Sequence, residues 1–139
     1  FLAKRPGLDS GFMIMQLTAA SLISENKVLA HPASVDSIPT SANQEDHVSM
    51  GSVSAIKLQQ IVENVNQVIA IEWIIAASAL DQRGIASSPA LESAKASLRK
   101  EVPVLAEDRV MYSDLAAAAK MTKNADILSA VEAGGLKIN

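Results

Sequence analysis

The residues best suited to chemistry lie in one polar stretch, His31 to Gly51, between two apolar segments. Within it, Gln44, Glu45, Asp46 and His47 follow one another and offer an amide, two carboxylates and an imidazole. A carboxylate can accept hydrogen bonds, exchange a proton or match the charge of a cationic ring. It can also simply stabilise the start of a helix. On the residues alone, this helix-capping role is the favoured interpretation of Glu45.

Two prolines make the first part of this stretch a loop. Pro32 and Pro39 remove backbone donors and disfavour helical geometry in the residues before them, so residues 31–42 are predicted to be a fixed loop. Asn43 can then cap a helix whose opening turn holds residues 44–46, near the positive end of the helix dipole. Loops held by rigid elements often carry binding and catalytic groups.

The run Glu45-Asp46-His47 consists of residue types that bind metals, but its spacing is unfavourable for a metal site. Neighbouring helix residues point about 100° apart, so these side chains cannot easily converge on one ion. The chain has no cysteine, which leaves only oxygen and imidazole ligands. We therefore predict no metal. His31 is interpreted as a loop anchor and not as a catalyst.

Apolar residues at helical spacing account for the segments on both sides of the loop. A first helix is predicted from Asp9 or Ser10 to about Ala30, and a second from about Gln44 to residue 81 or 82, stopped by Gly84. The first helix has its apolar residues at Phe12, Met15, Ala19, Leu22 and Ile23. The stripe of the second consists of Ala55, Leu58, Val62, Val65, Ile69, Trp73, Ala76 and Leu80, widened by Ile61, Val68 and Ile75.

From Val68 to Leu80 nearly every residue is apolar, so no helix face is left for water and burial on all sides is predicted. Three shorter helices follow and are insufficient to cover it, so we expect both further copies of the chain and further protein against it. They are predicted from Pro89, capped by Ser88, to about Val102, from about Glu107 to Thr122, and from a cap at Asn124 to Gly134-Gly135.

The whole chain is therefore predicted to be all-α. We expect one helical piece over residues 1–139, with core helices in 9–83 and a smaller helical region in 84–139. The net charge of −3 argues against nucleic acid or an anionic membrane surface as the main partner. The most apolar window is too short to span a bilayer, and no signal-peptide pattern is present. These observations predict a soluble, cytoplasmic protein.

Three segments resemble the aromatic amino acid ammonia-lyase family, and within it the members that act on histidine. They are Gly7-Leu-Asp-Ser-Gly-Phe-Met13, Ser24-Glu-Asn-Lys27 and, above all, His31 to Gly51. The resemblance is dense over residues 7–51 and continues more loosely to about Asp114. Family members are several times longer, so the chain is expected to be a C-terminal piece of one.

The resemblance implies a fold, a reaction and a site. The fold is a long-helix bundle of the ammonia-lyase and fumarase–aspartase type, assembled as a homotetramer. The reaction is the non-oxidative elimination of ammonia from L-histidine, giving urocanate. The family position that matches Glu45 contacts the substrate side chain, which makes Glu45 the candidate catalytic and substrate-binding residue. Gln44 matches a position that supports the same network. Relatives that act on phenylalanine or tyrosine tend to carry Gln at the position of Glu45.

One departure from the family is decisive for activity. Family members use a methylidene-imidazolone electrophile formed from an internal Ala-Ser-Gly, and this sequence has none. The chain alone is therefore expected to be inactive, and only the intact protein would be a carbon–nitrogen lyase. Two alternatives remain open. The intact protein would be an ammonia-lyase or aminomutase for another aromatic amino acid, or the chain would be a non-catalytic helical oligomerisation module.

Overall fold

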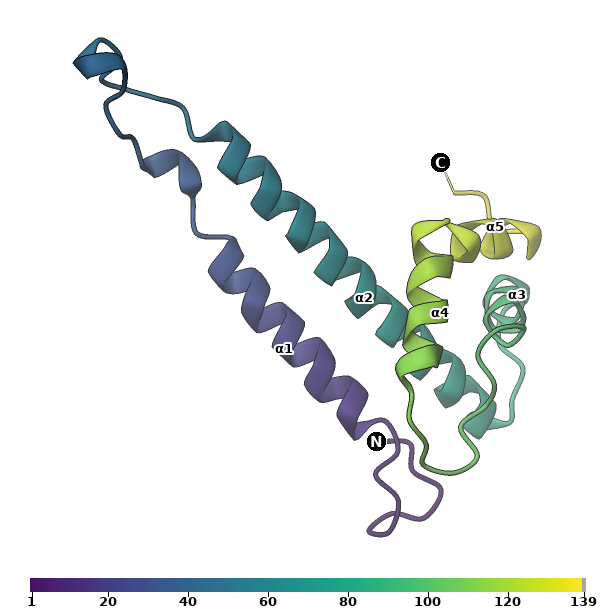
Figure 1. The fold of residues 1–139 in the computed structure, drawn as a ribbon. Coiled ribbons are helices and arrows are strands. Elements are labelled where there is room, and N and C mark those ends of the chain that lie inside the picture. The colour runs from purple at the N-terminus through teal and green to yellow at the C-terminus, as the bar shows by residue number, and fades with distance from the viewer. Residues whose placement is uncertain (139) are drawn as a thin grey trace.

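The structure, a computed structural model, describes residues 1–138 and consists of helices joined by loops. Two long helices, α1 and α2, lie side by side and antiparallel, and three shorter helices gather beside the second half of α2 (Figure 1). No strand occurs within residues 1–138, and the predicted all-α class is confirmed. The helices are α1 (Met13–Leu29), α2 (Gly51–Arg83), α3 (Pro89–Leu98), α4 (Tyr112–Lys123) and α5 (Asp126–Ala133).

The predicted start of the second helix is wrong, because α2 begins at Gly51 and not at Gln44. Ser41, Ala42 and Asn43 instead form a left-handed turn, with φ of 51°, 55° and 68°. A helix cap needs extended backbone, so Asn43 cannot serve as one. The Glu45 carbonyl oxygen accepts a hydrogen bond from the Thr40 N–H at 2.9 Å, so the backbone folds back on itself here and is not helical. The loop therefore extends to residue 50.

Helix ends set by local backbone chemistry agree with prediction. Gly84 ends α2 with φ of 66°, in the left-handed region that favours glycine. The Leu91 N–H donates to the Ser88 hydroxyl at 3.4 Å, and Pro89 occupies the first position of α3. Other ends differ by a few residues. The predicted caps at Asp9 or Ser10 and at Asn124 are replaced by Phe12 and Ala125. The predicted limits at Val102 and Glu107 become Leu98 and Tyr112.

Side chains at alternating spacings of three and four residues line the contact between α1 and α2, as in a coiled coil. All of them are buried or half-buried. We call these ten residues the seam: Met15, Ala19, Leu22, Asn26 and Leu29 on α1, and Ile61, Asn64, Val68, Ile71 and Ile75 on α2. The predicted apolar face of α1 is thus confirmed except for Ile23, which is exposed.

Most residues of the predicted apolar stripe of α2 do not face α1. Only Trp73 of that stripe is buried and Leu80 half-buried, whereas Leu58, Val62 and the other members are exposed. Within residues 1–138 the other helices leave one side of the segment from Val68 to Leu80 open, as predicted. The exposed residues on that side are Ile69, Glu72, Ala76 and Ala79.

The main hydrophobic core lies around the second half of α2. Ile74, Leu98 and Ala118 are each at most 1% exposed and come from α2, α3 and α4. A polar bridge supports the same region. The Arg99 guanidinium donates to the Asp81 carboxylate at 2.7 and 3.0 Å, and to the Ser78 hydroxyl at 3.1 Å. These bonds hold the end of α3 against α2.

α5 turns back and packs against α3, not only against its sequence neighbour α4 (Figure 1). The approach is close at Gly134, where an added Cβ would lie 2.5 Å from the Ala90 Cα and 2.7 Å from the Pro89 carbonyl oxygen. Such distances are far below van der Waals contact, so this contact requires glycine.

Candidate functional site

The loop of residues 30–50 joins α1 to α2 at the end of the hairpin opposite to α3, α4 and α5 (Figure 1). Three ties fix it. The Lys57 ammonium donates to the His31 carbonyl, at the C-terminal end of α1. The Val48 N–H donates to the Ser37 hydroxyl at 2.8 Å. The third tie is the left-handed turn, which is closed by the backbone pair of Thr40 and Glu45.

Gln44 and Glu45 follow directly after that turn, and both are exposed. The Gln44 backbone N–H donates to the Ser41 carbonyl oxygen at 3.1 Å. Among residues 1–138, none forms a hydrogen bond or an ion pair with the Glu45 carboxylate. Because α2 begins after this segment, Glu45 gains nothing from the helix dipole, whose effect is confined to the first turn. The structure thus removes the helix-capping interpretation of Glu45.

Two neighbouring grooves, which no sequence pattern predicted, lie at the other end of the molecule. The larger, of about 840 Å³, is bounded by the start of α1, residues 108–111, α2 and α4. Its charged groups are already used within the chain. The Asp108 carboxylate accepts the backbone N–H groups of Ser10 at 2.7 Å and Gly11 at 3.0 Å. Arg109 donates to Asp114 at 2.8 Å. These contacts hold loops together and leave little chemistry for a ligand.

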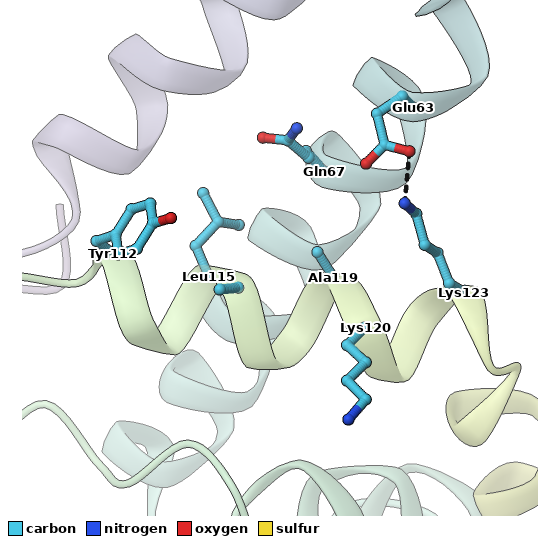
Figure 2. A pocket seen from close by; sticks show the side chains of 8 residues that line it. Glu63, Gln67, Tyr112, Leu115, Ala119, Lys120 and Lys123 are labelled. Atoms are coloured by element: carbon cyan, nitrogen blue, oxygen red, sulfur yellow. Dashed lines mark ion pairs between the residues drawn. The ribbon is translucent and has the colours of Figure 1, made fainter. Parts of the chain in front are cut away.

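The smaller groove, of about 390 Å³, lies between α2 and α4 (Figure 2). Glu63 and Lys123 form an ion pair across one end of it at 2.5 Å. Tyr112 lies at the other end, and Lys120 points away from Gln67 (Figure 2). Both side chains of this ion pair are substantially exposed, so the pair contributes little to stability. The carboxylate of Glu45, which has no partner within residues 1–138, lies on the loop and not in either groove.

Among residues 1–138, no group of three or more His, Asp or Glu side chains is arranged to hold a metal ion. None of the helices within the same residues is long and apolar enough to cross a bilayer.

Comparison with known proteins identifies the family. The sequence profile of the family described as aromatic amino acid lyase matches residues 1–100. This chain therefore belongs to the aromatic amino acid lyases, a family of carbon–nitrogen lyases.

The curated relatives are named histidine ammonia-lyase. The protein of Sorangium cellulosum is 56% identical over 133 residues, and that of Symbiobacterium thermophilum 54% identical over 134 residues. These alignments cover 95% and 96% of this chain but 26% of each relative. The chain thus spans about a quarter of the length of the curated relatives it matches.

Solved structures agree on the fold and differ in chemistry. The histidine ammonia-lyase of Trypanosoma cruzi superposes with a TM-score of 0.91 at 44% identity, covering 98% of this chain and 27% of its own. The tyrosine aminomutase of Streptomyces globisporus gives a TM-score of 0.94 at 34% identity, covering 100% and 27%. The ammonia-lyase type of helix bundle is therefore shown for this chain.

Proposed function

We propose that this chain is the substrate-recognition part of an enzyme that converts L-histidine to urocanate and ammonia by non-oxidative elimination. The observation that carries the proposal is the 56% identity to the Sorangium cellulosum histidine ammonia-lyase over 95% of the chain. The tyrosine aminomutase is only 34% identical, although its fold is as similar. Sequence identity therefore favours histidine over tyrosine as the substrate.

Glu45 is the residue that we propose to contact the substrate. Its carboxylate is exposed and free of partners within the described chain, and the loop that carries it is fixed at several points. An imidazole N–H can donate to such a carboxylate, and an imidazolium would add a favourable charge interaction. We propose that Glu45 binds the imidazole and assists the reaction, and that Gln44 supports this binding from the adjacent position.

The methylidene-imidazolone group does not fit the residues present in this chain. Its five Ala-Ser pairs are followed by Leu, Val, Ala or Ser, and never by Gly. Ala20-Ser21 and Ala77-Ser78 lie inside helices, where the backbone is already hydrogen-bonded. No step of the reaction is therefore assigned to this group within the chain. The residues of this chain would bind and orient the substrate.

We further propose that the chain works in a homo-oligomer, a tetramer according to the family resemblance. The exposed stripe of α2 supports this, because Val62, Val65 and Ile69 form an apolar row that lies away from α1 and is 41–60% exposed. A second copy would remove that row from water. The cytoplasmic location stays a prediction from sequence.

The test uses a chimera in which this chain replaces the matching segment of the Sorangium cellulosum enzyme. We expect urocanate formation by the chimera, and none above blank by the isolated chain. Glu45→Gln should lower kcat/KM for histidine by about tenfold to a hundredfold, because a charged hydrogen bond to the substrate is lost. Asp46→Asn, which changes the neighbouring exposed carboxylate, serves as the matched control. An unchanged kcat/KM in Glu45→Gln would contradict the proposal.

The similarity to the tyrosine aminomutase favours one second candidate, an aminomutase or ammonia-lyase for another aromatic amino acid. In that case the chimera would accept tyrosine or phenylalanine in preference to histidine. A non-catalytic oligomerisation module would instead form a defined oligomer on its own and would be indifferent to Glu45→Gln in every assay.

A further inference from the structure

One polar pair interrupts the otherwise apolar seam between α1 and α2. Asn64 is 1% exposed and occupies a seam position between Ile61 and Val68. Asn26 occupies a seam position of α1, between Leu22 and Leu29. The two meet: the Asn64 side-chain amide donates to the Asn26 side-chain oxygen at 2.9 Å.

The amide of Asn64 is fully engaged in this arrangement. The second N–H of the Asn64 amide donates to the Glu25 carboxylate on α1 at 2.7 Å. The Asn64 side-chain oxygen accepts an N–H from the Gln60 side chain, on α2 itself, at 3.0 Å. Both donors and the acceptor of a buried amide are thus satisfied by three residues, two of them on the opposite helix.

Only one register of the two helices allows this. If α1 slid along α2 by about one turn, Asn64 would face Leu22 or Leu29, and Asn26 would face Ile61 or Val68. The Asn64 N–H groups and the Asn26 side-chain oxygen would then lose their partners across the seam, and only the Gln60 bond within α2 would remain. Leaving the N–H groups of the buried Asn64 amide unpaired strongly disfavours the shifted state. A single buried Asn in a coiled-coil seam fixes register by the same mechanism. The remaining seam residues are apolar and tolerate sliding far better.

The register matters for the loop because both ends of the loop are helix ends. The Lys57 ammonium reaches the His31 carbonyl just beyond α1, so a slide of α1 would break this tie and change the span that residues 30–50 must bridge. We infer that Asn26 and Asn64 are positioning residues, which set the register of α1 against α2 and so hold Gln44 and Glu45 at a fixed place. The part concerning Glu45 rests on the proposed function.

A distance measurement tests the register without any activity. The chain has no cysteine, so Gln16→Cys and Gln59→Cys place one nitroxide label on the exposed face of each helix. Labelled chain is diluted with unlabelled chain, so that only distances within one chain are measured by double electron–electron resonance. We expect Asn64→Leu to shift or broaden the distance by about 5 Å, one helical turn, while helix content and Tm are kept. Ile61→Leu, a change of shape in the same seam without polar loss, should leave the distance unchanged.

Kinetics in the chimera then test the link to Glu45. Asn64→Leu should lower kcat/KM for histidine by about tenfold, because displaced binding groups lose their alignment. Combined with Glu45→Gln, it should add little, because both changes act on the same contact. A merely structural role would instead give multiplied losses.

The outcomes separate the two ideas. If Asn64→Leu does not fold, Asn26→Leu tests the same pair from α1. Unchanged distances in a folded variant would overturn the inference, whatever the kinetics. Multiplied losses in the double variant would overturn the link to Glu45. A shifted distance with a harmless Glu45→Gln would support the register and refute the proposed role of Glu45.

Discussion

The two halves of α2 belong to one continuous helix but have very different surroundings. In the second half, Ala70, Ile71, Trp73, Ile74 and Ala77 are buried under α1, α3 and α4. In the first half Asn64 is the one buried residue, while Val53, Ile56 and Leu58 are 45–69% exposed. The second half is thus the core of a small helical unit. The first half, with the loop that it carries, leaves most of its apolar side chains exposed.

A matched pair of substitutions on α2 should give the largest effect. Ile74→Ala removes a side chain that is 1% exposed, and we expect a loss of about 2–5 kcal/mol in the free energy of unfolding. Ile56→Ala removes one that is 69% exposed, and we expect a change of roughly 0.5 kcal/mol or less. Urea denaturation followed by circular dichroism measures both. Equal losses in the free energy of unfolding would mean that the first half of α2 is covered in solution. The two halves would then not differ in their surroundings.

The left-handed turn offers a smaller test of order in the loop. Ala42 has φ of 55°, which is unfavourable for a residue with a Cβ. Ala42→Gly should therefore raise the free energy of unfolding by about 0.5–1 kcal/mol. Ala33→Gly is the control, because Ala33 lies in the same loop without positive φ, and it should destabilise slightly. If both changes destabilise alike, the turn is not populated in the isolated chain.

The smallest effect concerns the pH dependence of the α3 region. The Glu92 carboxylate accepts hydrogen bonds from the Lys95 ammonium at 2.7 Å and from the Ser87 backbone N–H at 2.8 Å. These bonds lower the pKa of the Glu92 carboxyl. A lowered pKa in the folded state contributes stability above the unfolded value, about 4.3, and this stability is lost as the pH falls through the folded pKa.

Glu92→Gln should therefore lower Tm slightly at neutral pH, and the difference from the parent chain should vanish in acid. Thermal unfolding across a pH series measures this. Glu107→Gln, at an exposed position, is the control and should give no such pH-dependent difference. A Tm difference that stays constant down to low pH would assign the effect to packing and not to charge.

Sequence patterns predicted what is decided locally. The stop at Gly84 and the start at Ser88-Pro89 depend on backbone conformation and a single side chain, and both are found where expected. The start of α2 was missed because it depends on a backbone pair between Thr40 and Glu45 and on a left-handed turn that non-glycine residues rarely adopt.

The buried face of α2 was predicted only in part, for a different reason. Ile61, Val68 and Ile75, which were expected to widen the apolar stripe, lie in the seam, but the centre of the stripe does not. Two stripes compete along this helix, and the more apolar one, through Val62 and Ile69, is the one left open. The stripe that faces α1 contains Asn64, whose burial is favourable only because Asn26 and Glu25 lie opposite. Periodicity reveals a stripe but cannot show what lies across from it. The division into core helices 9–83 and a smaller region 84–139 stays a prediction.

The candidate site was predictable only in part. Glu45 was singled out by residue type and by the family resemblance, and the structure leaves its carboxylate free, as a binding role requires. The prediction that Glu45 lies in the first turn of a helix was wrong. The grooves beside Tyr112 were not foreseen, because they form where α1, α2 and α4 meet and have no signature in any one segment.

The return of α5 to α3 has a consequence for the covalent connection between α3 and α4. A chain opened at Ala106 would keep both pieces together, since the C-terminal piece would still hold α2 through α4 and α3 through α5. Backbone continuity at this point is therefore not what keeps the unit assembled. New chain termini could be placed there, or a second domain inserted, without releasing either piece.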